Sequence, residues 1–124
     1  GLKIIFCIGE TLKERRQKKT NQILKRQIEK GLKSIKNKSK IIIAYEPVWS
    51  IGTGIIPKEA VLNETILFIK SRFIKKYPKI LYGGSVNTNN VSILKKIASI
   101  DGFLIGGASQ NPKKFIDIIK KTIN

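Results

Sequence analysis

The chain has 124 residues, of which 41% are hydrophobic, and its formal net charge is +17. That hydrophobic content can form a core, but no run of ~18 apolar residues is present, so no membrane-spanning helix is expected. The first residues lack the basic leader, apolar centre and cleavage site of a secretory signal. A single cysteine, Cys7, excludes an intramolecular disulfide. We therefore expect a cytoplasmic protein without a membrane partner, in which Cys7 is a buried free thiol.

The positive charge raises the alternative of a nucleic-acid-binding protein, because basic surfaces attract phosphates. The lysines, however, are spread along the chain, mostly at positions suited to the solvent-facing sides of helices. Lys, Ile and Asn are all abundant, as an AT-rich coding sequence would produce. This pattern favours a solvated surface over a nucleic-acid-binding one.

Two βα units are predicted in the first part of the chain. Residues 3–8 form a continuous apolar run that ends at Gly9, as expected of a strand buried on both faces. The helix predicted after it carries its apolar residues on one side, at Leu24, Ile28, Leu32 and Ile35. Residues 40–45 form the second strand, which Glu46 closes, and Pro57 suits the first turn of the next helix. Apolar positions of that helix are Ala60, Ile66, Leu67, Ile69 and Phe73.

Two further βα units are predicted in the second part. Residues 80–82 form a strand that stops at two glycines, and residues 102–105 form another that also stops at two glycines. The short helix between them is marked by Val91, Leu94 and Ile97. Pro112 opens the last helix. Its inward-facing residues are predicted to be Phe115, Ile116, Ile118 and Ile119.

Four βα units with apolar strands predict an α/β fold with a parallel sheet and helices packed outside it. Four such units make half of an eight-stranded barrel. No linker or low-complexity segment divides the chain, so residues 1–124 are predicted to be a single partial domain.

Glu46 stands where catalytic residues of parallel βα folds are found, at the carboxyl end of a strand. A carboxylate that is partly removed from water is a stronger base toward a carbon acid. The alternative is an ordinary solvated or lysine-paired glutamate, and Glu46 alone does not decide between the two.

The glycine pairs that end the last two strands predict a phosphate site. Backbone amides of glycine turns can point at a phosphate, and Ser85 adds a hydroxyl beside Gly83 and Gly84. Gly106 and Gly107 hold the equivalent place on the next strand. The alternative is a pair of tight turns that need glycine for a positive φ.

Residues 49–54 combine small, flexible residues with an apolar centre, as expected of a lid that sheds water when it closes. The alternative is an ordinary surface loop with Trp49 packed beneath it.

Together these segments resemble one enzyme family. Residues 44–54 read Ala-Tyr-Glu-Pro-Val-Trp-Ser-Ile-Gly-Thr-Gly and closely resemble the catalytic strand and closing lid of the triosephosphate isomerases. Residues 7–12, 81–86 and 101–109 resemble the fifth, seventh and eighth strands of that family. Four motifs in this order, with helix-length spacing, are specific to it. The resemblance implies that the chain is the C-terminal half of a (β/α)8 TIM barrel.

The resemblance also implies roles for individual residues. Glu46 is the base that moves a proton between two carbons through an enediolate, which interconverts dihydroxyacetone phosphate and D-glyceraldehyde 3-phosphate in glycolysis and gluconeogenesis; this mechanism is taken over from the family. The substrate phosphate is held by backbone amides and a hydroxyl, from Gly52, Ser85, Gly106 and Gly107. The lid and its support comprise Trp49, Ile51, Thr53, Gly54, Glu10 and Leu104. Leu104 helps to desolvate the carboxylate. No cofactor and no metal are implied, and the family forms homodimers.

The chain departs from the family in what it lacks. The family's other catalytic groups are a lysine that ends strand one and a histidine that ends strand four, whereas this chain has no histidine. The chain does not begin with methionine, so we expect a fragment of a longer gene product that is inactive alone. In the lid, only Ile55 and Ile56 separate Gly54 from Pro57, where many members have a longer, polar stretch. The alternative function is a half-barrel that binds phosphate compounds without catalysis.

Overall fold

The computed structural model describes residues 2–73 and 78–124 of the chain. Its strands are β1 (Ile4–Ile8), β2 (Ile41–Tyr45), β3 (Ile80–Tyr82) and β4 (Gly102–Phe103). They form one parallel sheet in the order β1-β2-β3-β4. The predicted α/β fold of four parallel βα units is therefore confirmed. β4 is shorter than predicted, although Leu104 still donates its N–H to the carbonyl of Tyr82 at 3.0 Å.

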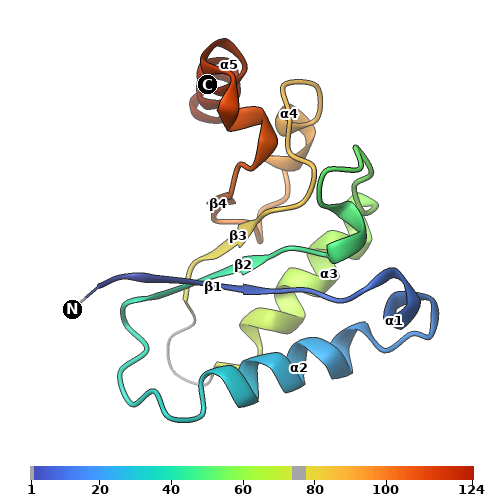
Figure 1. The fold of residues 1–124 in the computed structure, drawn as a ribbon, viewed down its shortest axis with the longest axis vertical. Coiled ribbons are helices and arrows are strands. Elements are labelled where there is room, and N and C mark those ends of the chain that lie inside the picture. The colour runs from blue at the N-terminus through green and yellow to red at the C-terminus, as the bar shows by residue number, and fades with distance from the viewer. Residues whose placement is uncertain (1, 74–77) are drawn as a thin grey trace.

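Helices follow each strand. The α-helices are α1 (Leu12–Arg16), α2 (Thr20–Gly31), α3 (Glu59–Lys70), α4 (Val91–Leu94) and α5 (Pro112–Ile123). Two short 3-10 helices, η1 (Val48–Ser50) and η2 (Gly107–Gln110), follow β2 and β4. Figure 1 shows α2 and α3 along one side of the sheet, whereas α5 lies far from them, beyond α4. Within the described residues, no helix is long and apolar enough to cross a membrane.

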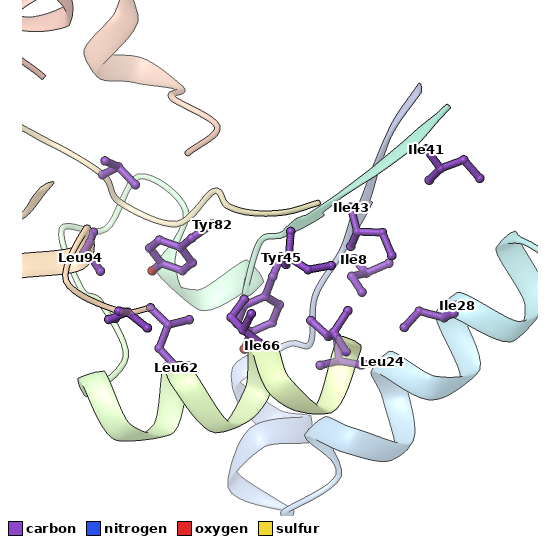
Figure 2. Close-up of a cluster of buried hydrophobic side chains, with 14 of the residues drawn as sticks. Ile8, Leu24, Ile28, Ile41, Ile43, Tyr45, Leu62, Ile66, Tyr82 and Leu94 are labelled. Carbon is purple, nitrogen blue, oxygen red and sulfur yellow. The ribbon is translucent and has the colours of Figure 1, made fainter. Parts of the chain in front are cut away.

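The core lies between the sheet and the helices α2 and α3 (Figure 2). Alternate residues of a strand point to opposite faces, and the register pairs Ile8 with Tyr45, Ile43 with Ile80, and Tyr45 with Tyr82. These side chains therefore share the face that meets the helices, and all five are buried. From the helices, Leu24, Leu62 and Ile66 complete this layer with no exposed surface.

The opposite face of β1 is not covered, so the prediction of a strand buried on both faces is wrong for β1. Ile5 is 46% exposed, and Cys7, two residues further on the same face, is exposed as well. The expectation of a buried thiol is therefore also wrong. The apolar run predicts a strand correctly, but α2 and α3 lie on only one side of it (Figure 1).

Two helix predictions need correction at their ends. α2 ends at Gly31, so Leu32 and Ile35 belong to the connection that follows, although Leu32 is buried. α3 begins at Glu59, so Pro57 precedes the helix rather than standing in its first turn. The buried side of α3 is formed by Leu62, Thr65, Ile66 and Ile69. Ala60 and Leu67 were predicted as apolar core positions, but both are exposed because they lie off this stripe.

The predictions for the last two helices are correct except for the buried side of α5. Val91, Leu94 and Ile97 are buried, as predicted for the short helix. Pro112 does open α5, where the side chain of Asn111 caps the helix by accepting the N–H of Lys114 at 3.0 Å. Of the four inward-facing residues predicted for α5, only Ile118 is buried, because the helix packs against α4 along a narrow side. The exposed three are Phe115, Ile116 and Ile119.

Two neighbouring residues of α3 offer a test of this core. Replacing Ile66 with Ala should lower the free energy of unfolding by about 2–5 kcal/mol, because the side chain is fully buried and its removal leaves a cavity. Replacing Leu67, which is 51% exposed, with Ala should change the free energy of unfolding by less than about 0.5 kcal/mol. Urea unfolding followed by circular dichroism measures both, and equal losses would contradict the described orientation of α3.

Candidate functional site

Glu46 lies between two glycines of the neighbouring strands. Its N–H continues the strand pairing by donating to the carbonyl of Ile8 at 2.8 Å, and its side chain is half-buried. A Cβ placed on Gly83 would come within 2.6 Å of the Glu46 Cγ and 2.8 Å of its Oε1. A Cβ on Gly9 would come within 1.9 Å of the Glu46 carbonyl oxygen. Only glycine fits at either place while Glu46 keeps its position.

Cys7 lies beside the carboxylate of Glu46. The register pairs Cys7 with Ala44. Side chains two positions apart along a strand point to the same face of the sheet, so Ala44, and with it Cys7, shares the face of Glu46. Partial desolvation, a hydrogen bond to the Glu46 carboxylate and the charge of that carboxylate raise the pKa of Cys7 to about 11. The thiol therefore remains protonated near neutral pH and can donate to Glu46.

A second carboxylate, Glu10, supports the start of the predicted lid. It is fully buried, and the hydroxyl of Tyr45 donates to its two oxygens at 3.0 and 3.1 Å. Trp49 Nε1 donates to Glu10 at 3.2 Å, and Arg15 Nη1 forms an ion pair with it at 3.1 Å. Burial and the charge of Glu10 raise the pKa of Tyr45, so its hydroxyl stays a donor. The structure thus brings Glu10 and Trp49 together, as the predicted support of the lid requires.

Sequence reasoning missed the other members of this cluster, Arg15 and Tyr45. The guanidinium of Arg15 also stacks on the Trp49 ring, 4.8 Å from its centroid. One signal was available: Tyr45 is the last residue of a buried strand, and a buried tyrosine hydroxyl usually finds a partner.

The predicted lid projects from the surface of the molecule after η1. Ile51 is 51% exposed, and Gly52 and Gly54 adopt φ angles of 68° and 77°, where side chains other than that of glycine are strained. Within the segment, the Thr53 hydroxyl donates to the carbonyl of Trp49 at 3.1 Å and accepts the N–H of Ile55 at 3.2 Å. The segment is therefore a structured turn rather than a loosely packed loop.

Ser85 joins the lid to the turn after β3. Its hydroxyl accepts the N–H of Gly54 at 2.9 Å and donates to the carbonyl of Ser50. Its own N–H donates to the same carbonyl at 3.1 Å. Two of the residues predicted to bind phosphate or to form the lid, Ser85 and Gly54, are thus in direct contact.

The glycine pairs after β3 and β4 are not explained by positive φ angles. Among the described glycines, only Gly52 and Gly54 have them. Gly84 is needed for close approach instead, since a Cβ there would lie 2.0 Å from the Tyr82 hydroxyl. No described atom lies within 4 Å of a Cβ built on Gly106 or Gly107, so the backbone after β4 borders open space.

Leu104 lies two strands away from Glu46. It continues β4, whereas Glu46 follows β2, with β3 between them. Leu104 is half-buried. The shielding of Glu46 by Leu104 therefore stays a prediction.

A hollow of about 990 Å³ lies at the other end of the strands. Its floor is apolar and includes Ile28, Ile41 and Phe73. The residues that give it a positive rim are Lys3, Lys33, Lys36, Lys38, Lys40, Arg72 and Lys79. None of the predicted site residues lines it. In the described part of the chain, no group of His, Cys, Asp and Glu side chains could hold a metal ion.

Comparison with known proteins identifies the family. The sequence model of the family Triosephosphate isomerase matches residues 1–122. The chain belongs to the triosephosphate isomerase family. It is 45% identical to a triosephosphate isomerase from Thermodesulfovibrio yellowstonii over 97% of its length, which is 51% of that relative. With the enzyme from Mycoplasma mobile it shares 47% identity over 94% of its length and 48% of the relative, and with that from Candida albicans 43% over 99% and 52%. The chain thus spans about half the length of the curated relatives it matches, and its four βα units are half of a TIM barrel.

The contact between Cys7 and Glu46 predicts a change in thiol reactivity. Replacing Glu46 with Gln removes the negative charge that raises the pKa of Cys7 and replaces the carboxylate by an amide oxygen, a weaker hydrogen-bond acceptor. The pKa should fall, and each unit of that fall increases the thiolate fraction about tenfold. Because Cys7 is the only cysteine, the rate of iodoacetamide labelling at about pH 8, followed by mass spectrometry, reports it directly.

The matched control is Glu59→Gln, which removes an exposed carboxylate from the first turn of α3. It should leave the labelling rate unchanged. A Glu46→Gln variant that labels no faster than this control would contradict the contact.

Proposed function

We propose that the protein to which this chain belongs is a triosephosphate isomerase, with Glu46 as its proton-transferring base. The observation that carries the proposal is the position of Glu46, which is held closely between Gly9 and Gly83. In addition, the lid is hydrogen-bonded to Ser85 in the turn that begins with Gly83. Membership of the family and the names of the relatives support the same reaction.

In the proposed reaction Glu46 moves one proton between adjacent carbons of a three-carbon sugar phosphate. The carboxylate removes a proton from the CH₂OH carbon of dihydroxyacetone phosphate, and the electron pair left behind forms the enediolate. The acid form of Glu46 then returns a proton to the neighbouring carbon. The hydroxyl proton on the oxygen of the first carbon passes to the oxygen of the neighbouring carbon, which yields glyceraldehyde 3-phosphate.

The phosphate of the substrate is assigned to the turns beside the lid. Gly52, Ser85, Gly106 and Gly107 are the proposed ligands, through backbone amides and the Ser85 hydroxyl. To donate to the phosphate, the Ser85 hydroxyl exchanges its bond to the Ser50 carbonyl for one to the ligand. The open space beside Gly106 and Gly107 leaves room for a ligand. η2 turns there because the Gly106 carbonyl accepts the N–H of Ser109 at 2.9 Å and its hydroxyl at 2.7 Å.

The chain alone is proposed to be inactive. The resemblance assigns a lysine and a histidine to the half of the barrel that this chain does not span, and the chain has no histidine. Without those groups the charge that develops on the substrate oxygens is not stabilised. The homodimer, the cytoplasmic location and the place in glycolysis and gluconeogenesis belong to the proposal for the full-length protein.

A half-barrel that binds phosphate compounds without turnover is the second candidate. It is favoured by one observation: the lid, Ser85 and the turn after β3 are already joined within this chain. Binding of a sugar phosphate by the full-length gene product without any isomerisation would support it.

Glu46→Gln in the full-length gene product tests the proposed base. An amide cannot accept the proton, so kcat in a coupled isomerase assay should fall by about 10²–10⁴-fold. The control is Glu64→Gln on the exposed side of α3, which should keep the wild-type rate. Wild-type activity in Glu46→Gln would overturn the assigned role.

Gly83→Ala tests whether the position of the Glu46 carboxylate matters, without changing the carboxylate itself. The new Cβ would come within 2.6 Å of the Glu46 Cγ, so the side chain must move. A displacement of about 1 Å should lower kcat on the order of 10²-fold, while thermal unfolding stays near that of the wild type. Gly102→Ala is the control, since its Cβ meets only the flexible end of Leu81, at 3.0 Å. Equal activity of the two variants would contradict the geometry.

A further inference from the structure

Ser50 is fully buried although it begins an exposed segment. It is the last residue of η1 and has no exposed surface, whereas the next residue, Ile51, is 51% exposed. A buried serine hydroxyl costs free energy unless it is hydrogen-bonded. The partners of Ser50 therefore indicate why a polar residue occupies this place.

The hydroxyl of Ser50 connects both ends of the lid with β3. Ser50 Oγ donates to the carbonyl of Ile55 at 2.5 Å, which ties the second residue of the lid to the residue that follows Gly54. It also lies 3.0 Å from the hydroxyl of Tyr82, the last residue of β3. One side chain thus fixes the two ends of the lid against the strand that leads to the proposed phosphate turn.

A third contact of Ser50 reaches the phosphate turn itself. The Ser50 carbonyl accepts the N–H of Ser85 at 3.1 Å and also accepts the Ser85 hydroxyl hydrogen. The Ser85 N–H lies 3.4 Å from Ser50 Oγ as well. Ser85 in turn accepts the N–H of Gly54. Ser50, Ser85 and the lid therefore form one connected hydrogen-bonded unit.

Gly84 leaves the space in which the two hydroxyls meet. A Cβ on Gly84 would lie 2.0 Å from Tyr82 Oη and 2.5 Å from Ser50 Oγ. The lid is also short at its second end, where only Ile55 and Ile56 precede Pro57. The bond from Ser50 to the Ile55 carbonyl holds this short end in place, which a longer connecting segment would do through its own backbone.

We propose that Ser50 is a positioning residue, which holds the lid over the phosphate-binding turn through the Tyr82 hydroxyl and the Ile55 carbonyl. This inference rests on the proposed function, since it assigns the lid and Ser85 to phosphate binding. The hydrogen-bond partners of Ser50 among the described residues do not include Glu46, so Ser50 is proposed to act through the lid. Loss of its hydroxyl releases the lid and leaves the Tyr82 hydroxyl and the Ile55 carbonyl without this partner.

Ser50→Ala in the full-length gene product tests the inference. The dissociation constant of inorganic phosphate, measured by calorimetry, and the KM for the triose phosphate should both rise about fivefold, as expected from the loss of a hydrogen bond. The value of kcat should change by less than about twofold, because these lid contacts are made in the ground state and the transition state alike. Phosphate affinity equal to that of the wild type would overturn the proposal.

Ser99→Ala is the matched control. Ser99 is also buried, at 6% exposure, but its hydroxyl has no hydrogen-bond partner among the described residues. Its removal should leave phosphate affinity and KM unchanged. If Ser99→Ala and Ser50→Ala weaken phosphate binding equally, the loss reflects general destabilisation and the positioning role is wrong.

Tyr82→Phe provides a second variant that keeps the size of the side chain. It should weaken phosphate binding in the same direction, and Ser50→Ala should add less in the Tyr82→Phe background than in the wild type, because the two hydroxyls act as one unit. Fully additive effects would overturn the coupling. Failure of the proposed function is distinguishable, since the wild-type product would then not isomerise the triose phosphate or Glu46→Gln would keep the wild-type rate. Phosphate titration of the Ser50 variants needs no turnover.

Discussion

The register of β1, β2 and β3 surrounds Glu46 so closely that glycine is required on both sides, at Gly9 against the Glu46 backbone and at Gly83 against the Glu46 side chain. Parallel pairing fixes this register over β1 and β2 and continues it into β3. Because the carbonyl of Ile8 accepts the Glu46 N–H, the carboxylate is delivered by the strand pairing itself and not by a mobile loop. Sites held by paired strands can keep a reacting group within the narrow tolerances that catalysis requires. The buried layer of Ile8, Ile43 and Ile80 on the other face of the sheet maintains that register.

The lid depends on the same strands. On its first side, Glu10 follows β1 and fixes Trp49 with help from Tyr45 of β2. On its second side, Ser50 meets Tyr82 of β3. The hydroxyls of two strand-end tyrosines, whose ring centroids are 6.4 Å apart, thus anchor the two sides of one loop. Any shift of β2 against β3 would separate these anchors, so the position of the carboxylate and that of the lid are set by one packing arrangement.

The sequence predicts the strands well, but it predicts poorly which faces of the strands and helices are covered. Continuous apolar runs locate β1, β2 and β3 almost to the residue, because a strand in a parallel sheet needs apolar side chains on both faces. The same runs cannot say what packs on each face, which is why Ile5, Cys7 and Phe115 are more exposed than predicted. An apolar residue favours burial, but whether it is buried depends on which other segment packs against it.

Residues of the candidate site show the same division. The placement of Glu46, Ser85 and the lid follows from the end of each strand, whereas the roles assigned to them rest on resemblance. The hydroxyl network around Ser50 was not predicted, because it joins positions that are 32 and 35 residues apart in sequence. The sequence offers a phosphate site or a positive φ as the reason for the glycine pairs, whereas Gly83 and Gly84 make room for the side chains of Glu46, Tyr82 and Ser50. Such contacts exist only once the register is formed.

The excess of lysine has a consequence for small anions. The chain has eight acidic residues against 25 basic ones, and of the acidic residues Glu10 is buried and Glu46 is half-buried, so few negative charges offset the positive ones. A charge distribution of this kind produces a long-range positive potential, which draws anions toward the molecule and speeds their encounter with it. Because mobile ions screen this potential within about 10 Å at 0.1 M salt, the encounter slows as ionic strength rises. The excess of lysine therefore favours the encounter of small anions with the molecule, among them the sugar phosphate proposed as its substrate.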